Sequence, residues 1–350
     1  MVRIAVIQGD GIGKEVMPEA ESTLLLAAEA VSFKIEFDHF EWGSDRYLEK
    51  GRALPEDACE ILSKDFDAIF HGAVGDPRIG GSIVQEQILL GLRFGLDLYA
   101  NIRPSRLYHE DLTPIKDKKA GEIDHVVVRE NTEGLFVNMG GFFKEGTKDE
   151  VAVQEEIHTY KGVERIIRTA FLYAERHRRK KVTMADKASG LKYAGGIWRR
   201  IFEEVRSDFS HIDSEAKHID AVAMELIQHP SDFDVLVTNN MYGDILSDVT
   251  SGLVGGIGLA PSVNMNVNGI SLFEPVHGTA PDIVGKGIAN PVASILTSAL
   301  ILDHLGCEEG ASLIRRAVES SIADGCRTSD LGGSLSTEEC GEEIRDRLKQ

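Results

Sequence analysis

The alternation of short β-branched or aromatic runs with helical patterns constrains the fold of this chain most strongly. Strands that alternate with helices predict an α/β architecture with a largely parallel sheet and short crossovers. No internal repeat, low-complexity tract or Pro/Ser-rich linker interrupts the pattern, so the two domains that 350 residues allow should be interleaved rather than tethered. The runs of strand length lie at residues 3–8, 33–40, 68–70, 125–129, 181–184, 235–238 and 271–273.

Acidic residues outnumber basic ones, with 57 Asp and Glu against 38 Lys and Arg and a formal net charge of −19. Nucleic acids and anionic membrane surfaces select for positive patches, so this charge disfavours both as partners. It does not exclude a small anionic substrate, because a few local arginines can still capture one.

The cysteines and apolar segments are typical of a cytoplasmic protein. No signal peptide is visible. The longest apolar stretch, residues 291–305, contains polar residues and is shorter than the roughly 20 residues of a membrane span, so it predicts a buried helix and no membrane partner. Scattered cysteines without a CxxC pair favour reduced thiols over a zinc site or disulfides, and they are Cys59, Cys307, Cys326 and Cys340.

A glycine-rich loop at residues 9–13 (GDGIG) follows the first strand and precedes a helix. The position suggests a dinucleotide-binding fingerprint, but the spacing is GxGxG rather than GxGxxG, and an acid lies inside the loop. Glycines that the backbone needs for positive φ and close packing explain the loop equally simply.

Asp244 and Asp248 are four residues apart after the run at 235–238. If a helix begins here, both carboxylates project from one face. Two converging carboxylates repel each other unless a cation lies between them, and oxygen ligands suit Mg²⁺ or Mn²⁺. For an arbitrary GDxxxD sequence, however, the commoner interpretation is that Asp244 caps the helix and Asp248 is solvated.

Three arginines, Arg93, Arg103 and Arg129, are candidates for binding carboxylates. Arg129 ends the run at 125–129, and sheet ends are where ligands usually bind in α/β folds. Guanidinium groups match carboxylates bidentately, so three of them suit a diacid, although each alone could form a surface ion pair. Lys187, just after the run at 181–184, could act as a base if its surroundings lower its pKa.

Taken together, these motifs resemble the β-decarboxylating dehydrogenase family of isocitrate and 3-isopropylmalate dehydrogenases. The similarity covers nearly the whole chain in order. The matching segments are residues 9–13 (GDGIG), 89–93 (LLGLR), 101–104 (NIRP), 128–134 (VRENTEG), 186–187 (DK), 240–248 (NMYGDILSD) and 273–282 (FEPVHGTAPD).

The resemblance implies an isopropylmalate-dehydrogenase-like, two-domain α/β/α sandwich without a standard Rossmann domain. The larger domain, residues 1–99 and 255–350, would carry the cofactor side, and the smaller, residues 100–254, the substrate, the metal and the dimer interface. The protein would be a homodimer with shared active sites, in which Lys187 and Asp220 reach the site of the partner.

The resemblance also assigns roles by motif position. Asp220, Asp244 and Asp248 would bind Mg²⁺ or Mn²⁺, and Lys187 would receive the proton of the substrate hydroxyl. NAD is expected rather than NADP, because Asp282 can accept hydrogen bonds from the ribose hydroxyls and repel a 2′-phosphate. The substrate residues would be Arg93, Arg103, Arg129, Leu89 and Leu90, and the cofactor residues Gly72, Ala73, Val74, Ser189, His277, Gly278, Thr279, Ala280, Asp282 and Asn290.

The leucine pair Leu89 and Leu90 favours 3-isopropylmalate as the substrate, because this pair covers the isopropyl group in isopropylmalate dehydrogenases. Residues 131–134 (NTEG) look more like isocitrate, homoisocitrate or tartrate/D-malate enzymes. A D-malate/tartrate or homoisocitrate dehydrogenase therefore stays open as an alternative.

Two positions depart from the family pattern. Phe136 stands at the position of the catalytic tyrosine, which protonates the enolate after decarboxylation, and Ser189 stands at that of an asparagine near the nicotinamide. Tyr99, Tyr108, Tyr193 or a water could replace the missing hydroxyl. The hypotheses are an alkylmalate dehydrogenase with a displaced acid, a dehydrogenase that omits the protonation, and a catalytically weakened family member with a binding role.

Overall fold

The computed structural model describes residues 1–349, and their contacts divide the chain into two compact units. Unit 1 comprises Met1–Leu98, Arg103–Ile123 and the described residues from Ser251 onward, and unit 2 comprises Tyr99–Ile102 and Asp124–Thr250. Because unit 1 contains both ends of the chain, the units are interleaved in sequence. Residues 103–123 and 251–254, expected in the smaller domain, group with unit 1.

The strands of unit 1 are β1 (Val2–Ile7), β2 (Ile35–His39), β3 (Ala68–His71), β11 (Pro261–Met265) and β12 (Leu272–Pro275). Their order is β2-β1-β3-β12-β11, and the pairs are parallel except β11 with β12. All of β3 and the last four residues of β1 are buried, as expected for parallel strands that helices cover on both faces.

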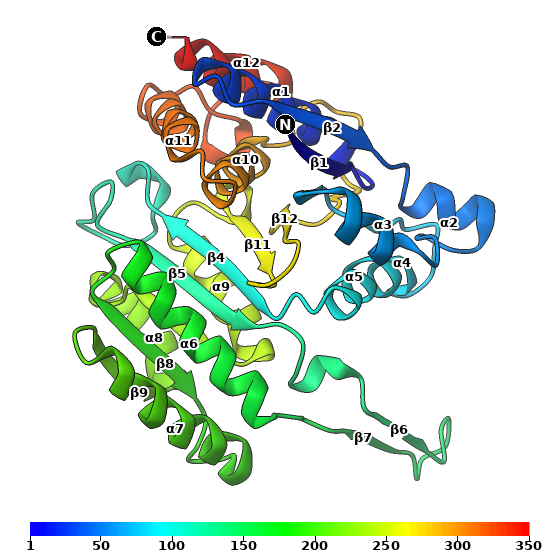
Figure 1. Cartoon of the computed structure of the whole chain (residues 1–350), viewed down its shortest axis with the longest axis vertical. Coiled ribbons are helices and arrows are strands. Elements are labelled where there is room, and N and C mark those ends of the chain that lie inside the picture. The colour runs from blue at the N-terminus through cyan, green and yellow to red at the C-terminus, as the bar shows by residue number, and fades with distance from the viewer. Residues whose placement is uncertain (350) are drawn as a thin grey trace. The chain divides into compact units, whose positions relative to one another are not determined.

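Helices from the two ends of the chain pack together in unit 1. Figure 1 shows α1 in blue beside α10, α11 and α12 in orange to red. A capping box of Ser336 and Glu339 fixes the start of α12. The bounds are α1 (Gly13–Ala30), α2 (Ser44–Lys50), α3 (Ala58–Asp65), α4 (Ile83–Gln85), α5 (Gly91–Gly95), α10 (Val292–His304), α11 (Glu308–Ala323) and α12 (Thr337–Leu348).

The main strands of unit 2 are β5 (Asp124–Glu130), β8 (Lys181–Asp186), β9 (Asp213–His218) and β10 (Val235–Thr238). They are all parallel, in the order β5-β10-β8-β9. The valines of β5 and β10 are fully buried, which suits β-branched residues in the centre of a sheet. The helices are α6 (Tyr160–Arg176), α7 (Lys192–Arg206), α8 (Ile219–Gln228) and α9 (Asn240–Gly252), the last ending in unit 1.

An antiparallel hairpin of β6 (Gly140–Phe143) and β7 (Val151–Gln154) extends away from the rest of unit 2 (Figure 1). Every residue of both strands is exposed, including Phe142 and Phe143. The strand β4 (Ala100–Arg106) contributes residues to both units.

The α/β architecture is confirmed, and each strand that the alternation predicts is present. Residues 291–305 form the buried helix α10, and no helix within residues 1–349 is long and apolar enough to cross a membrane. None of the four cysteines forms a disulfide. The strands β4, β6, β7, β9 and β11 were not predicted, because polar residues, glycine or proline interrupt their apolar patterns.

Candidate active site

Arg129 lies at the carboxyl end of β5 and is held there by the first turns of α9. Its Nε and Nη2 donate to Asn240 Oδ1 at 2.9 and 2.7 Å, and its Nη1 pairs with the Asp244 carboxylate. A Cβ on Gly243 would lie 2.6 Å from Arg129 Cγ, so only glycine lets the arginine stem approach the helix this closely. The guanidinium carbon also lies 5.5 Å from the centroid of the Phe136 ring.

Asp244 and Asp248 both lie inside α9, one turn apart. The helix begins at Asn240, so Asp244 is not its cap, and the i, i+4 spacing places both carboxylates on one face. Their carboxylate oxygens fit Mg²⁺ or Mn²⁺. Within residues 1–349 of one chain, however, no group of three potential metal-binding side chains comes together. A cation here therefore needs further oxygen ligands.

Lys187 and Asp220 form a second charged pair in unit 2. Lys187 follows β8, Asp220 lies in the first turn of α8, and the lysine Nζ donates to Asp220 Oδ1 at 2.6 Å. The hydrogen bond from Lys187 lowers the pKa of Asp220. Both side chains keep solvent contact, so they can reach a second molecule.

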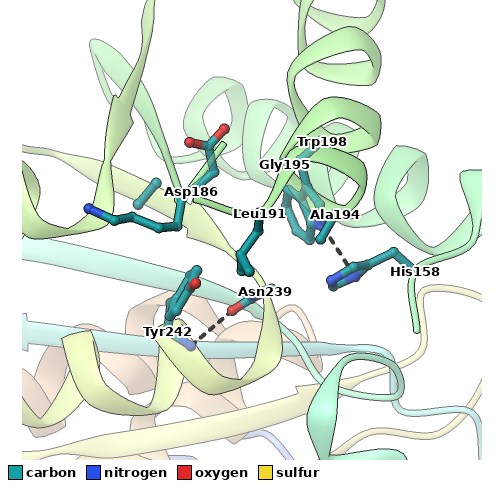
Figure 2. A pocket seen from close by; sticks show the side chains of 10 residues that line it. His158, Asp186, Leu191, Ala194, Gly195, Trp198, Asn239 and Tyr242 are labelled. Atoms are coloured by element: carbon teal, nitrogen blue, oxygen red, sulfur yellow. Dashed lines mark hydrogen bonds between the residues drawn. The ribbon is translucent and has the colours of Figure 1, made fainter. Parts of the chain in front are cut away.

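A small pocket in unit 2 connects Lys187 with the start of α9 (Figure 2). Trp198 Nε1 donates to His158 Nδ1 at 3.2 Å, which leaves the proton of the neutral imidazole on Nε2. That Nε2 lies 2.9 Å from a carboxylate oxygen of Glu156. Asn239 Nδ2 donates to the same carboxylate at 3.0 Å, so this set of side chains fixes the residue that precedes the helix.

Tyr242 lines the same pocket. Its backbone N–H donates to Asn239 Oδ1 at 2.9 Å (Figure 2). Burial raises the pKa of Tyr242, and the nearby charges of Glu156 and Asp186 add to the effect.

The segment 131–134 is anchored from both ends. The buried Glu130 carboxylate accepts from the backbone N–H groups of Thr132 at 3.0 Å and Glu133 at 2.7 Å, and burial raises the pKa of Glu130. Asn240 Nδ2 donates to the carbonyl of Glu133 at 3.0 Å. Phe136 follows in a short 3₁₀ turn, Leu135–Val137.

In unit 1, Arg93 faces a buried carboxylate. Its Nη2 lies 3.6 Å from Glu274 Oε1, Asn264 Nδ2 donates to the same oxygen at 2.8 Å, and His71 Nδ1 lies 3.4 Å from Glu274 Oε2. Burial alone would raise the pKa of Glu274, but His71, Arg93 and Asn264 outweigh it and hold this pKa at about 2. The Nε of Arg93 is buried without a partner among the described residues, which leaves a donor for a ligand.

The other predicted substrate residues of unit 1 lie in a π-helical turn and in a strand. Leu89 and Leu90 end a π-helical turn, Glu86–Leu90, between α4 and α5, rather than a regular α-helical turn before Arg93. Both leucines are partly buried. Arg103 lies in the middle of β4, where it is buried, and not at a strand end.

The glycine-rich loop at 9–13 joins two of the predicted cofactor segments. The N–H of Asp10 donates to the carbonyl of Ala73 at 2.7 Å, and that of Ile12 donates to the carbonyl of Thr279 at 3.1 Å. Gly9 and Gly11 have φ of +76° and +56°, which supports the backbone explanation of the glycines.

The acid inside this loop has an internal role. The buried Asp10 carboxylate accepts from Ser44 Oγ at 2.6 Å and from the N–H of Gly75 at 2.8 Å. It therefore stabilises the loop that includes Gly72, Ala73 and Val74.

The predicted adenosine loop, residues 277–282, contains buried and exposed positions. His277 is buried, with its Nε2 unpartnered among the described residues, and burial lowers its pKa. Gly278 and Asp282 are exposed, and Ala280 has a φ of +41°. Asn290 Nδ2 donates to Asp330 at 2.9 Å, so the structure already uses part of this amide. Ser189 is exposed in the turn between β8 and α7 of unit 2.

Several residues of these arrangements had no predicted role. Asp10, Glu130, Asn240 and Glu274 lie within the quoted motifs, but only the fold shows what they contact. The only signal in the sequence was their position beside the assigned residues.

The family profile described as isocitrate/isopropylmalate dehydrogenase matches residues 3–344. A 3-isopropylmalate dehydrogenase of Bifidobacterium longum is 45% identical over 349 residues, covering 99% of this chain and 98% of that protein. A tartrate dehydrogenase/decarboxylase of Pseudomonas putida is 44% identical over 358 residues, covering 99% and 97%. The structure of an isocitrate dehydrogenase from Methylococcus capsulatus has a TM-score of 0.89 and 38% identity, with full coverage of both chains.

Proposed function

Because the chain belongs to the isocitrate/isopropylmalate dehydrogenase family and is a decarboxylating dehydrogenase, we propose that it acts on 3-isopropylmalate with NAD and Mg²⁺ or Mn²⁺. The observation that carries the proposal is the fixed position of Arg129 beside Asp244. This ion pair supports the proposal because Arg129 would donate to a substrate carboxylate while the neighbouring Asp244 would offer an oxygen to a cation.

Different residues of the chain bind the substrate, hold the cation and accept the proton. Arg129, which is buried, and Arg93, which is partly buried, are each paired with a carboxylate and bind the substrate carboxylates, with Arg103 as the third arginine. Asp244 and Asp248 would hold the cation, which would supply Lewis-acid stabilisation of the 2-hydroxyl oxygen, and a bound nicotinamide would supply the hydride acceptor. Lys187 receives the hydroxyl proton.

The cofactor side lies in the larger domain. The loop at 9–13 contacts both Ala73 and Thr279, so the predicted cofactor segments share one support. The exposed carboxylate of Asp282 favours the free ribose hydroxyls of NAD over the 2′-phosphate of NADP.

A homodimer with shared sites would complete the metal set. One chain does not bring three metal-binding side chains together within residues 1–349, and Asp220 with Lys187 is accessible to a second copy. Apolar side chains of α8, Met224 and Ile227, are exposed, as is Ile245 of α9. Exposed apolar side chains at helical spacing are typical of a surface that a partner covers.

A D-malate or tartrate substrate is the second candidate, and homoisocitrate stays a third. The tartrate dehydrogenase/decarboxylase relative, at 44% identity, supports the second candidate. An apolar pocket around Leu89 and Leu90 discriminates by only about 1–3 kcal/mol per methylene, so several malates can be turned over.

A panel of acids tests the proposal. D-isopropylmalate, D-malate, tartrate, isocitrate and homoisocitrate are each incubated with NAD and Mn²⁺, while NADH and CO₂ are followed together. We expect the highest kcat/KM with D-isopropylmalate and equal amounts of the two products. A higher kcat/KM with D-malate or tartrate than with D-isopropylmalate would show that 3-isopropylmalate is not the preferred substrate. Formation of NADH without CO₂ would contradict decarboxylation.

A further inference from the structure

Loss of CO₂ from the oxidised substrate leaves an electron pair on the carbon that carried the carboxylate, and that carbon must then gain a proton. Phe136 has no proton to give. Tyr99 is buried, with its hydroxyl 3.1 Å from Thr169 Oγ1. Tyr108 is buried with its ring 5.9 Å from the Arg106 guanidinium carbon, and Tyr193 is 86% exposed. None of these three lines the pocket that contains Lys187.

Tyr242, in contrast, lines the same pocket as Lys187. It lies in the first turn of α9, and its ring extends from that helix into the pocket beside Leu191 (Figure 2). No hydrogen bond to its hydroxyl forms within residues 1–349. The hydroxyl is therefore available to a ligand, while the backbone of Tyr242 is fixed through Asn239 and Glu156.

Tyr242 and Asp244, the partner of Arg129, lie on different faces of α9. Residues two apart on a helix point in nearly opposite directions, so Tyr242 faces the Lys187 pocket while Asp244 contacts Arg129. In a dimer with shared sites, Tyr242 would accompany Lys187 and Asp220 to the site of the partner.

We propose that Tyr242 supplies the proton that the position of Phe136 cannot, in the same active site that Lys187 serves. The tyrosine O–H bond breaks and a C–H bond forms at the carbon that lost CO₂, with the electron pair of the enolate becoming that bond. Lys187, protonated by the substrate hydroxyl during oxidation, then returns a proton to the tyrosine oxygen. The tyrosine proton thus ends on carbon, the proton released by the substrate hydroxyl replaces it on the tyrosine, and the turnover needs no external acid.

This inference rests on the proposed function, and its test separates the two. The keto-acid product of 3-isopropylmalate, 4-methyl-2-oxopentanoate, is incubated with enzyme and Mn²⁺ in D₂O without NAD. Exchange of its C3 hydrogens is followed by NMR. This exchange reverses the protonation step and requires no oxidation. A second readout is the burst of NADH in the first turnover.

For Tyr242→Phe we expect exchange to fall by about 10²–10⁴-fold, the usual contribution of a general acid, while the NADH burst persists. The exposed Tyr193→Phe is the matched control and should retain wild-type exchange. Phe136→Tyr should not accelerate exchange, because the hydroxyl is already supplied.

Wild-type exchange in Tyr242→Phe, together with an intact NADH burst, would overturn the role of Tyr242 and leave the proposed function standing. If Phe136→Tyr increased the rate of exchange by more than about tenfold, the hydroxyl would have been missing from the wild-type site, because a general acid typically contributes about 10²–10⁴-fold. That result would also overturn the role of Tyr242. A wild-type protein without NADH formation on any acid of the panel would overturn both. Urea unfolding of each variant checks that the fold is kept.

Discussion

Arg129 and Asp244 form an ion pair in which the arginine side chain is 3% exposed and the carboxylate 44% exposed. Burial fixes the guanidinium group of Arg129, and two of its nitrogens also donate hydrogen bonds to Asn240 Oδ1. The partly exposed carboxylate keeps access to solvent and to a cation. The pair therefore aligns an arginine on the sheet with the position on α9 that we propose for the metal.

Asp244→Asn is expected to weaken Mn²⁺ binding in the presence of substrate by at least about tenfold, because affinity for hard cations follows the number of charged oxygen ligands. Asp248→Asn should do the same. Calorimetric titration of Mn²⁺ measures both. The control is Asp213→Asn, an exposed carboxylate at the start of β9. Unchanged affinity in both variants would exclude a cation at this part of α9.

NAD should be preferred over NADP by more than about tenfold in kcat/KM, or 1.4 kcal/mol, because Asp282 repels a 2′-phosphate. Replacing the carboxylate with a small neutral group, as in Asp282→Ser, should reduce the ratio of kcat/KM for NAD to that for NADP, mainly because the KM for NADP falls. Asp57→Ser, at another exposed carboxylate of unit 1, should leave it unchanged. Equal efficiency of the wild-type protein with the two cofactors would contradict the assignment.

Stability at acid pH should depend on Glu274. Its pKa of about 2 lies below the ordinary value of 4.5, so the folded state stabilises the carboxylate. This contribution, on the order of 3 kcal/mol, is fully present above pH 4.5 and is lost as the pH falls toward 2. Glu274→Gln should therefore lower the free energy of unfolding at pH 6 and have little effect near pH 2. Urea titrations across this range measure it, and a pH-independent difference would argue against the ionised pair.

Local pattern was enough to predict strands β1, β2, β3, β5, β8, β10 and β12, because each of these runs is rich in apolar or β-branched residues. The spacing of Asp244 and Asp248 predicted a shared face only if a helix began there, and α9 meets that condition. The hairpin β6–β7 could not be predicted, because GGFF and VAVQ lie fully exposed and do not alternate between an inner and an outer face.

Contacts between distant residues could not be predicted either. Arg93 and Glu274 are 181 residues apart in the sequence, and only the adjacency of their elements in unit 1 brings them within 3.6 Å. Tyr242 lay inside a quoted motif, but its access to the pocket with Lys187 depends on how α9 meets the end of β8.

Dimer formation should depend on the exposed face of α8. Met224 and Ile227 are three residues apart and are 52% and 54% exposed. The double variant Met224→Glu with Ile227→Glu places like charges on a surface that would meet its own copy, and we expect it to be monomeric and inactive. Leu48→Glu, at a 49% exposed leucine of α2, is the control and should leave the mass unchanged. Light scattering gives the mass, and a wild-type monomer with full activity would refute shared sites.

Gly11 and Gly51 both have positive φ, +56° and +72°, but their surroundings differ. A Cβ on Gly11 would lie 2.3 Å from the carbonyl oxygen of Thr279, whereas nothing lies within 4 Å of one on Gly51. Alanine at either position strains the backbone by about 1–2 kcal/mol. Only Gly11→Ala must also displace the loop at 277–282.

We therefore expect both variants to lose stability in urea, and only Gly11→Ala to lose affinity for NAD, as measured by fluorescence titration of NADH. Mn²⁺ binding should survive in both, because Asp244 and Asp248 lie on α9 in unit 2. Normal NADH affinity in Gly11→Ala would mean that the Thr279 loop does not contact the cofactor.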